Sequence, residues 1–154
     1  QRLIFSELNG EFRNVDRHYL YRAVRDFKYD RLVSWDEQDD GTVRIVLTDK
    51  GRKRALKYNL EEMQIKRPSH WDGVWRIVMF DIPEKSREGR EAIREQLKRL
   101  GFYEMQKSVY VFPYECRDEI DFTVEFFDLR RYVRYAEMLD PTNEEELKLR
   151  FDIS

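Results

Sequence analysis

Apolar and polar positions follow two different periods in the second half of the chain. Residues 75–80 form an almost continuous apolar run, which is typical of a central strand covered on at least one face. Residues 84–100 then repeat apolar side chains at helical spacing, and Gly101 supplies a stop at the C-terminal end. The pattern therefore predicts a strand followed directly by an amphipathic helix.

The pattern of apolar residues also predicts strands at residues 102–105 and 109–112, a helix at 115–127 and a strand at 132–138. The order strand, helix, strand, strand, helix, strand is the split βαβ arrangement, in which two helices cover one face of a four-stranded antiparallel sheet. The other face would be free, and a free apolar face predicts a symmetric homodimer. The tail at residues 147–153 fits both an edge strand and a helical turn, and the sequence does not separate the two.

The first half of the chain shows a shorter pattern. Apolar residues recur at helical spacing from Val15 to Phe27, with Asp16 as an expected N-cap. Two alternating stretches then flank Asp39-Asp40-Gly41, which predicts a hairpin, and Thr48 is placed to cap a further helix. A helix followed by a hairpin is the helix and wing of a winged-helix module.

The first predicted helix has a basic and aromatic face opposite its apolar stripe. Arginine forks and flanking aromatic rings suit contact with phosphates and guanine edges, although a solvated helix face is the alternative. The start of the second predicted helix is also basic. The residues we expect to bind nucleic acid are His18, Arg22, Arg25, Lys28, Tyr29, Lys50, Arg52 and Lys53. The acidic hairpin tip at residues 36–40 would repel phosphates, so the hairpin is not expected to make contact.

These patterns predict an α+β chain made of a winged-helix segment followed by a ferredoxin-like βαββαβ domain. We expect the winged-helix-like domain at residues 1–62 and the ferredoxin-like domain at 75–154. The stretch between them, residues 63–74, contains Pro68 and Gly73 and is expected to be a linker.

The composition of the chain excludes several classes of protein. The 154 residues carry 29 Lys and Arg against 31 Asp and Glu, and the basic excess lies in the first half, where 15 Lys or Arg face 12 Asp or Glu up to residue 70. The longest apolar run is far shorter than the roughly 20 residues that a membrane-spanning helix needs, and the start shows no signal-peptide pattern. One cysteine and two histidines exclude a zinc site of the usual ligand count. We expect a cytoplasmic protein in a reducing compartment that does not contact a membrane.

A longer motif carries a resemblance to known families. Residues 75–84, with the sequence WRIVMFDIPE, are followed by Leu100-Gly101-Phe102 and then by residues 106–111, with the sequence QKSVYV. This series resembles the small CRISPR-associated adaptation endonuclease. It equally resembles the middle domain of PaaX, a transcriptional repressor whose N-terminal domain is a winged helix. Because the sequence stops at Ser154, we expect no counterpart of the third domain of PaaX, and the front module has no counterpart in the nuclease.

The nuclease resemblance implies a role for Asp81, which matches an aspartate at the end of the first strand. In that family the aspartate approaches its symmetry mate and is associated with a divalent metal, so Mg²⁺ at the dimer axis is the implied cofactor. The structural alternative is that Asp81 braces the turn before Pro83. Whether the chain is an enzyme stays open at this point.

Two functions follow from the resemblance. The first is a dimeric, PaaX-like DNA-binding transcriptional regulator, with double-stranded DNA as its partner. The alternative is a CRISPR-adaptation protein, either a metal-dependent endonuclease or a non-catalytic subunit that bridges DNA and binds the CRISPR integrase. A scaffold whose front module binds protein is the third reading.

Overall fold

The computed structural model describes residues 17–40 and 43–153. The chain divides into two compact units, the first ending at Asn59 and the second beginning at Leu60. We call them unit 1 and unit 2 and describe each separately.

Unit 1 contains a helix, a hairpin and the start of a second helix. The elements are α1 (Arg17–Tyr29), β1 (Val33–Glu37), β2 (Val43–Leu47) and α2 (Asp49–Glu62), the last of which ends in unit 2. The two strands pair antiparallel, as the alternating pattern predicts. The predicted helix, hairpin and helix are therefore present, while the predicted cap Asp16 and the turn glycine Gly41 lie outside the described residues.

The start of α2 is fixed by Thr48. Its Oγ1 accepts a hydrogen bond from the Gly51 amide at 3.0 Å, which confirms the predicted N-cap. The same hydroxyl donates to the Arg31 carbonyl at 2.7 Å. Gly51 packs so closely here that a Cβ on it would lie 1.9 Å from the Leu32 carbonyl oxygen. Only glycine therefore lets α2 begin against the loop between α1 and β1.

Unit 2 is a mixed α and β structure around one sheet. Its elements are β3 (Trp75–Phe80), η2 (Glu84–Ser86), α3 (Arg87–Arg99), β4 (Tyr103–Gln106), β5 (Val109–Phe112), α4 (Arg117–Phe126), β6 (Val133–Met138) and α5 (Glu144–Phe151). The four strands run antiparallel in the order β4-β5-β3-β6. The element order and strand order are those of the split βαβ arrangement, as predicted.

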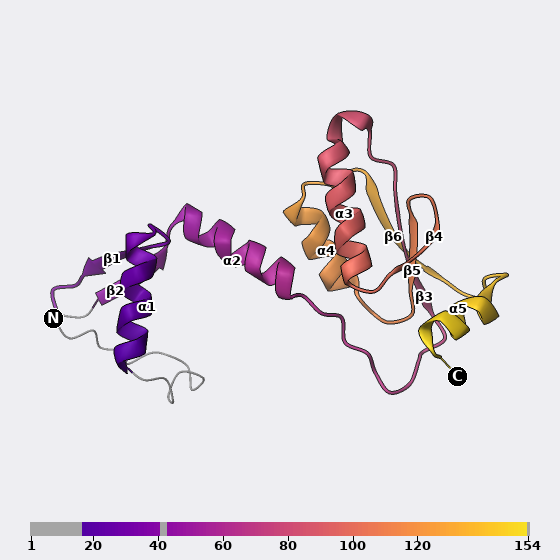
Figure 1. Ribbon diagram of the computed structural model, residues 1–154, viewed down its shortest axis with the longest axis horizontal. Helices are drawn as coiled ribbons and strands as arrows, with labels where there is room; N and C mark the ends of the chain where they lie inside the picture. Colours follow the sequence, from indigo (N-terminus) through magenta and orange to yellow (C-terminus); the bar gives the residue numbers. More distant parts are fainter. Residues whose placement is uncertain (1–16, 41–42, 154) are drawn as a thin grey trace. The chain divides into compact units, whose positions relative to one another are not determined.

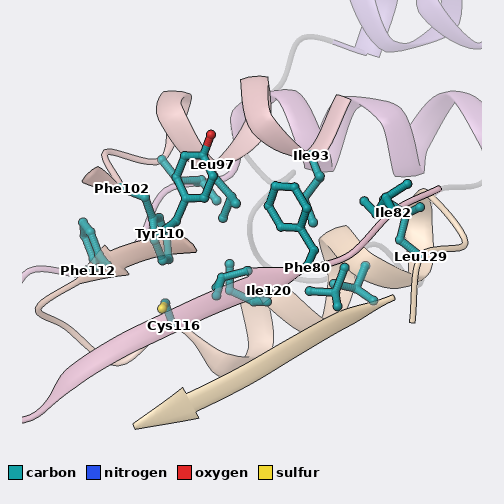
Figure 2. Close-up of a cluster of buried hydrophobic side chains, with 14 residues drawn as sticks. Phe80, Ile82, Ile93, Leu97, Phe102, Tyr110, Phe112, Cys116, Ile120 and Leu129 are labelled. Carbon is teal, nitrogen blue, oxygen red and sulfur yellow. The ribbon is translucent and has the colours of Figure 1, made fainter. Parts of the chain in front are cut away.

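The main core lies between this sheet and the helices α3 and α4, which Figure 1 shows together on one side of the strands. Phe80 and Tyr110 stack across β3 and β5 with ring centroids 5.8 Å apart, beneath Ile93 and Leu97 of α3 (Figure 2). The alternation of β3 explains this packing, because every second residue of a strand points to the same face.

Helix α5 lies against the opposite face of the sheet (Figure 1), which corrects the prediction that this face is free. Leu147 of α5 is fully buried against Trp75 and Ile77 of β3. The Trp75 indole also donates a hydrogen bond to Glu144 Oε1 at 3.1 Å. The tail that fitted both a strand and a helix is therefore a helix, and it covers the first half of β3.

The far end of β3 lacks this cover. Met79 is 37% exposed and does not belong to the apolar cluster beneath α5. The second face of the sheet is thus apolar and covered at one end and accessible at the other. In the described part of the chain, no helix is both long and apolar enough to cross a membrane.

Candidate nucleic-acid interface and the groove at Asp81

Four of the predicted contact residues on α1 are exposed to solvent, namely Arg22, Arg25, Lys28 and Tyr29. Arg22, Arg25 and Tyr29 are exposed and recur at spacings of three and four residues, which places them along one side of the helix. Tyr29 is 87% exposed. His18 lies in the same helix, but its side chain is outside the described residues. The structure therefore places a short row of two guanidinium groups and one phenol on α1.

Three of the predicted contact residues, Lys28, Lys50 and Arg52, make contacts within unit 1. The Lys28 ammonium lies 3.5 Å from the centre of the Trp35 ring, in a cation–π contact. Lys50 donates to the Asp30 carbonyl at 2.9 Å, where it satisfies the end of α1. These two cations hold the helix, hairpin and second helix together.

Arg52 also forms bonds within unit 1, whereas Lys53 forms none in the part of the chain that the structure describes. Arg52 donates to the Leu47 carbonyl at 2.9 Å and pairs with Asp49 one turn earlier. Lys53 is exposed on α2. Among the predicted contact residues, Arg22, Arg25 and Tyr29 form an exposed row that the structure places along one side of a single helix.

In unit 2, three segments distant in sequence meet around Asp81. The Phe80 amide donates to the Ser108 carbonyl at 3.1 Å, and the Asp81 amide donates to the Tyr132 carbonyl at 3.1 Å. Ser108 has a φ of 63°, which forms the tight turn between β4 and β5. The end of β3 is thereby fixed between the β4–β5 turn and the segment that leads into β6.

These segments line an open groove of about 670 Å³. Three of its side chains are cations, namely Lys107, Arg131 and Arg134, and all three are exposed. Asp81 is the one carboxylate among the described residues that line it. Asp81 was predicted from the sequence, whereas the three cations were not, because nothing in their local sequence marks them as neighbours.

The Mg²⁺ that the nuclease resemblance implies does not fit one chain of this structure. Mg²⁺ prefers near-octahedral oxygen coordination, including carboxylate or phosphate ligands. Among the described residues there is no group of three or more His, Cys, Asp or Glu side chains that could hold a metal ion. The groove places one carboxylate among three cations, which would repel a divalent cation. A site formed by Asp81 and its mate in a second chain stays a prediction.

The remaining reactive side chains form no catalytic set in the described part of the chain. Cys116 is fully buried, and burial raises the pKa of its thiol to about 12, so it is not a thiolate nucleophile at neutral pH. His70 contacts only the neighbouring Ser69 hydroxyl, at 3.0 Å on the surface. Neither residue has the oriented partner that nucleophilic catalysis needs.

A protein-family model matches the second half of the chain. The PaaX protein central Cas2-like domain matches residues 68–149, which is just over half of the chain. The match includes the whole four-stranded sheet, the groove at Asp81 and most of α5. No curated protein matches the chain significantly.

Proposed function

Because the chain belongs to the PaaX family, we propose that it is a DNA-binding transcriptional regulator that contacts duplex DNA through α1 of unit 1. Family membership is carried by the match over residues 68–149. Unit 1 precedes the matched region, and its helix, hairpin and helix stand in the order expected of a winged helix. This order supports a winged-helix role for unit 1, as the resemblance to PaaX implies.

The exposed row on α1 supports a DNA contact. Arg22 and Arg25 lie one turn apart on an exposed face, with Tyr29 one turn further on. Guanidinium groups bond bidentately to phosphates and to guanine edges, and a helix of this size fits the major groove. The acidic residues Asp36 and Asp39 are exposed near the hairpin tip, which favours contact through the helix over contact through the hairpin.

We also propose that two copies pair through unit 2, so that two α1 helices meet the two halves of a palindromic site. The pairing surface is the uncovered end of the second sheet face, where Met79 is exposed beyond the reach of α5. A symmetric dimer buries such apolar side chains without leaving open edges.

Duplex binding across a salt series tests the DNA contact. Arg22→Ala with Arg25→Ala should weaken binding and reduce the slope of log affinity against log salt by about two, since each lost phosphate contact removes about one unit. Lys85→Ala with Lys98→Ala is the matched control, because it removes the same charge from exposed positions of unit 2. Equal affinity of the wild type and the α1 variant would exclude this face.

Light scattering tests the dimer separately. The wild type should be a dimer at micromolar concentration, and Met79→Glu should be a folded monomer. A monomeric wild type would remove the paired arrangement and leave the α1 contact to be judged on its own data.

A metal-dependent endonuclease is the second candidate, favoured by one observation. Asp81 is exposed at the end of β3 and lines an open groove. If two such carboxylates hold Mg²⁺ between chains, duplex cleavage should require Mg²⁺ and disappear in Asp81→Asn, while the dimer persists. Cleavage that survives this change would remove Asp81 from the reaction.

A further inference from the structure

The groove at Asp81 has a charge opposite to that expected of a divalent metal site. Lys107, Arg131 and Arg134 contribute three positive charges to its lining, against the single negative charge of Asp81. None of the three cations forms an ion pair with a carboxylate in the described part of the chain. Their charges are therefore available to an anion in the groove.

The backbone holds these cations in place from both sides of β3. Lys107 precedes Ser108, whose carbonyl accepts from the Phe80 amide, and Arg131 precedes Tyr132, whose carbonyl accepts from the Asp81 amide. The groove thus has cations from both sides of β3, and the separation of their backbone positions is set by the hydrogen bonding of one sheet. Such a preformed arrangement lowers the entropy cost of binding.

Arg134 has a structural task in addition to its charge. Its Nη1 donates to the carbonyls of Val133 at 2.9 Å, Arg131 at 3.2 Å and Arg130 at 3.3 Å. These bonds shape the turn that leads into β6. Arg131 lies against the Tyr132 ring, 5.5 Å from its centre, which limits the orientations of its side chain.

Hydrogen-bond donors accompany the positive charges. Ser108 and Tyr132 line the same groove and carry hydroxyl groups, and both side chains are half-buried. Charged donors together with hydroxyl groups are the usual partners of phosphate oxygens. The openness of the groove to solvent suits a phosphate carried on a larger molecule.

We propose that this groove binds phosphate groups directly through Lys107, Arg131 and Arg134, without a bridging divalent cation. The site lies in unit 2 and is additional to the α1 contact in unit 1. Because Met79 of the proposed pairing surface also lines this groove, the proposal rests on the groove staying open to solvent beside that surface. Two sources supply the same chemistry, namely free phosphate and the phosphodiester backbone of duplex DNA. The test contains one arm for each source.

The experiment is an amide chemical-shift titration of the full ¹⁵N-labelled chain in the presence of EDTA. Inorganic phosphate is the first probe, and a short duplex DNA is the second. The duplex arm uses Arg22→Ala with Arg25→Ala as background, so that contacts of unit 1 do not dominate. The groove variant is Lys107→Gln with Arg131→Gln, which leaves the bracing Arg134 intact, and Lys85→Gln with Lys98→Gln is the charge-matched control.

Both probes should shift the amides of residues 107–109 and 131–134, and the groove variant should weaken the apparent affinity about tenfold while the control leaves it unchanged. Shifts with inorganic phosphate alone support the site and identify a small phosphate ligand. Groove shifts that appear only after Mg²⁺ is added, or that persist unchanged in the groove variant, overturn the proposal. No groove shift with either probe also overturns it, and the salt dependence conferred by Arg22 and Arg25 is unaffected by that result.

Discussion

Replacing Arg76 with methionine should lower the free energy of unfolding of unit 2 by about 2 to 3 kcal/mol. Arg76 is only 4% exposed although it is charged, and it lies at the start of β3. Its guanidinium donates to both carboxylate oxygens of Asp72, at 2.7 and 2.6 Å. It also donates to the backbone carbonyls of Val74 at 2.7 Å and Pro113 at 2.9 Å.

The magnitude comes mainly from the backbone partners. Arg76 also pairs with Glu115 at 3.3 Å. Asp72 and Glu115 are 53% and 59% exposed, so water solvates them when Arg76 is removed, and each pair contributes only about 0 to 1 kcal/mol. The bond to Pro113 is buried, and a buried carbonyl without a donor costs about 1 to 3 kcal/mol. Asp72→Asn should therefore cost much less than Arg76→Met.

Urea unfolding followed by far-ultraviolet circular dichroism measures both variants. Arg87→Met is the matched control, since Arg87 is exposed in the first turn of α3, and it should stay within about 0.5 kcal/mol of the wild type. If Arg76→Met were as stable as the wild type, the buried bond to Pro113 would contribute nothing. If Asp72→Asn cost as much as Arg76→Met, the ion pair would outweigh the backbone contacts. Either result would refute this reasoning.

Three further predictions concern pH, unit 1 and α5. The hydrogen bond from Arg76 lowers the pKa of Asp72 below its usual 3.8. The ionised carboxylate therefore stabilises the fold above about pH 4, and this stabilisation is lost as pH falls through the lowered pKa. In an acid titration, Asp72→Asn should lose less stability over this pH range than the wild type does. Gly51→Ala should destabilise unit 1 by about 1 to 3 kcal/mol despite the better helix propensity of alanine, because of the contact with the Leu32 carbonyl, and thermal unfolding that matches the wild type would contradict this. Leu147→Ala should cost about 2 to 5 kcal/mol and shift tryptophan emission to the red as Trp75 gains water, whereas Leu149→Ala, at an 84% exposed position of the same helix, should do neither.

Sequence patterns predicted the sheet of unit 2 well because its strands obey a strong local rule. The apolar runs at residues 75–80 and 109–112 have their side chains where a packed sheet requires them, and the strands occur at those residues. The helix predicted from residue 84 begins as the short helix η2 and continues as α3 from Arg87. Local propensity decides the presence of such elements more firmly than their ends.

The local pattern of the tail, residues 147–153, does not decide between a strand and a helix. Leu147, Leu149, Phe151 and Ile153 alternate as a strand would, yet Leu147 and Phe151 are also four residues apart, as on one face of a helix. Contacts with Trp75 decide the outcome, because Leu147 and Phe151 both pack into its cluster while Leu149 is 84% exposed. That information belongs to a residue some 70 positions away, so the tail alone could not supply it.

The groove at Asp81 also depends on contacts between residues that lie far apart in the sequence. Met79 pairs with Val109 on one side and with Arg134 on the other, so the register of two strand pairs brings the β4–β5 turn and the start of β6 to the end of β3. Each cation taken alone is typical of a solvated surface, and only the sheet order β5-β3-β6 makes them neighbours. A one-residue slip of β6 would move Arg134 to the helix-covered face and remove it from the groove. The charge around Asp81 is therefore set by strand register, which is why the motif that marks Asp81 does not by itself determine whether the site attracts a metal ion or a phosphate.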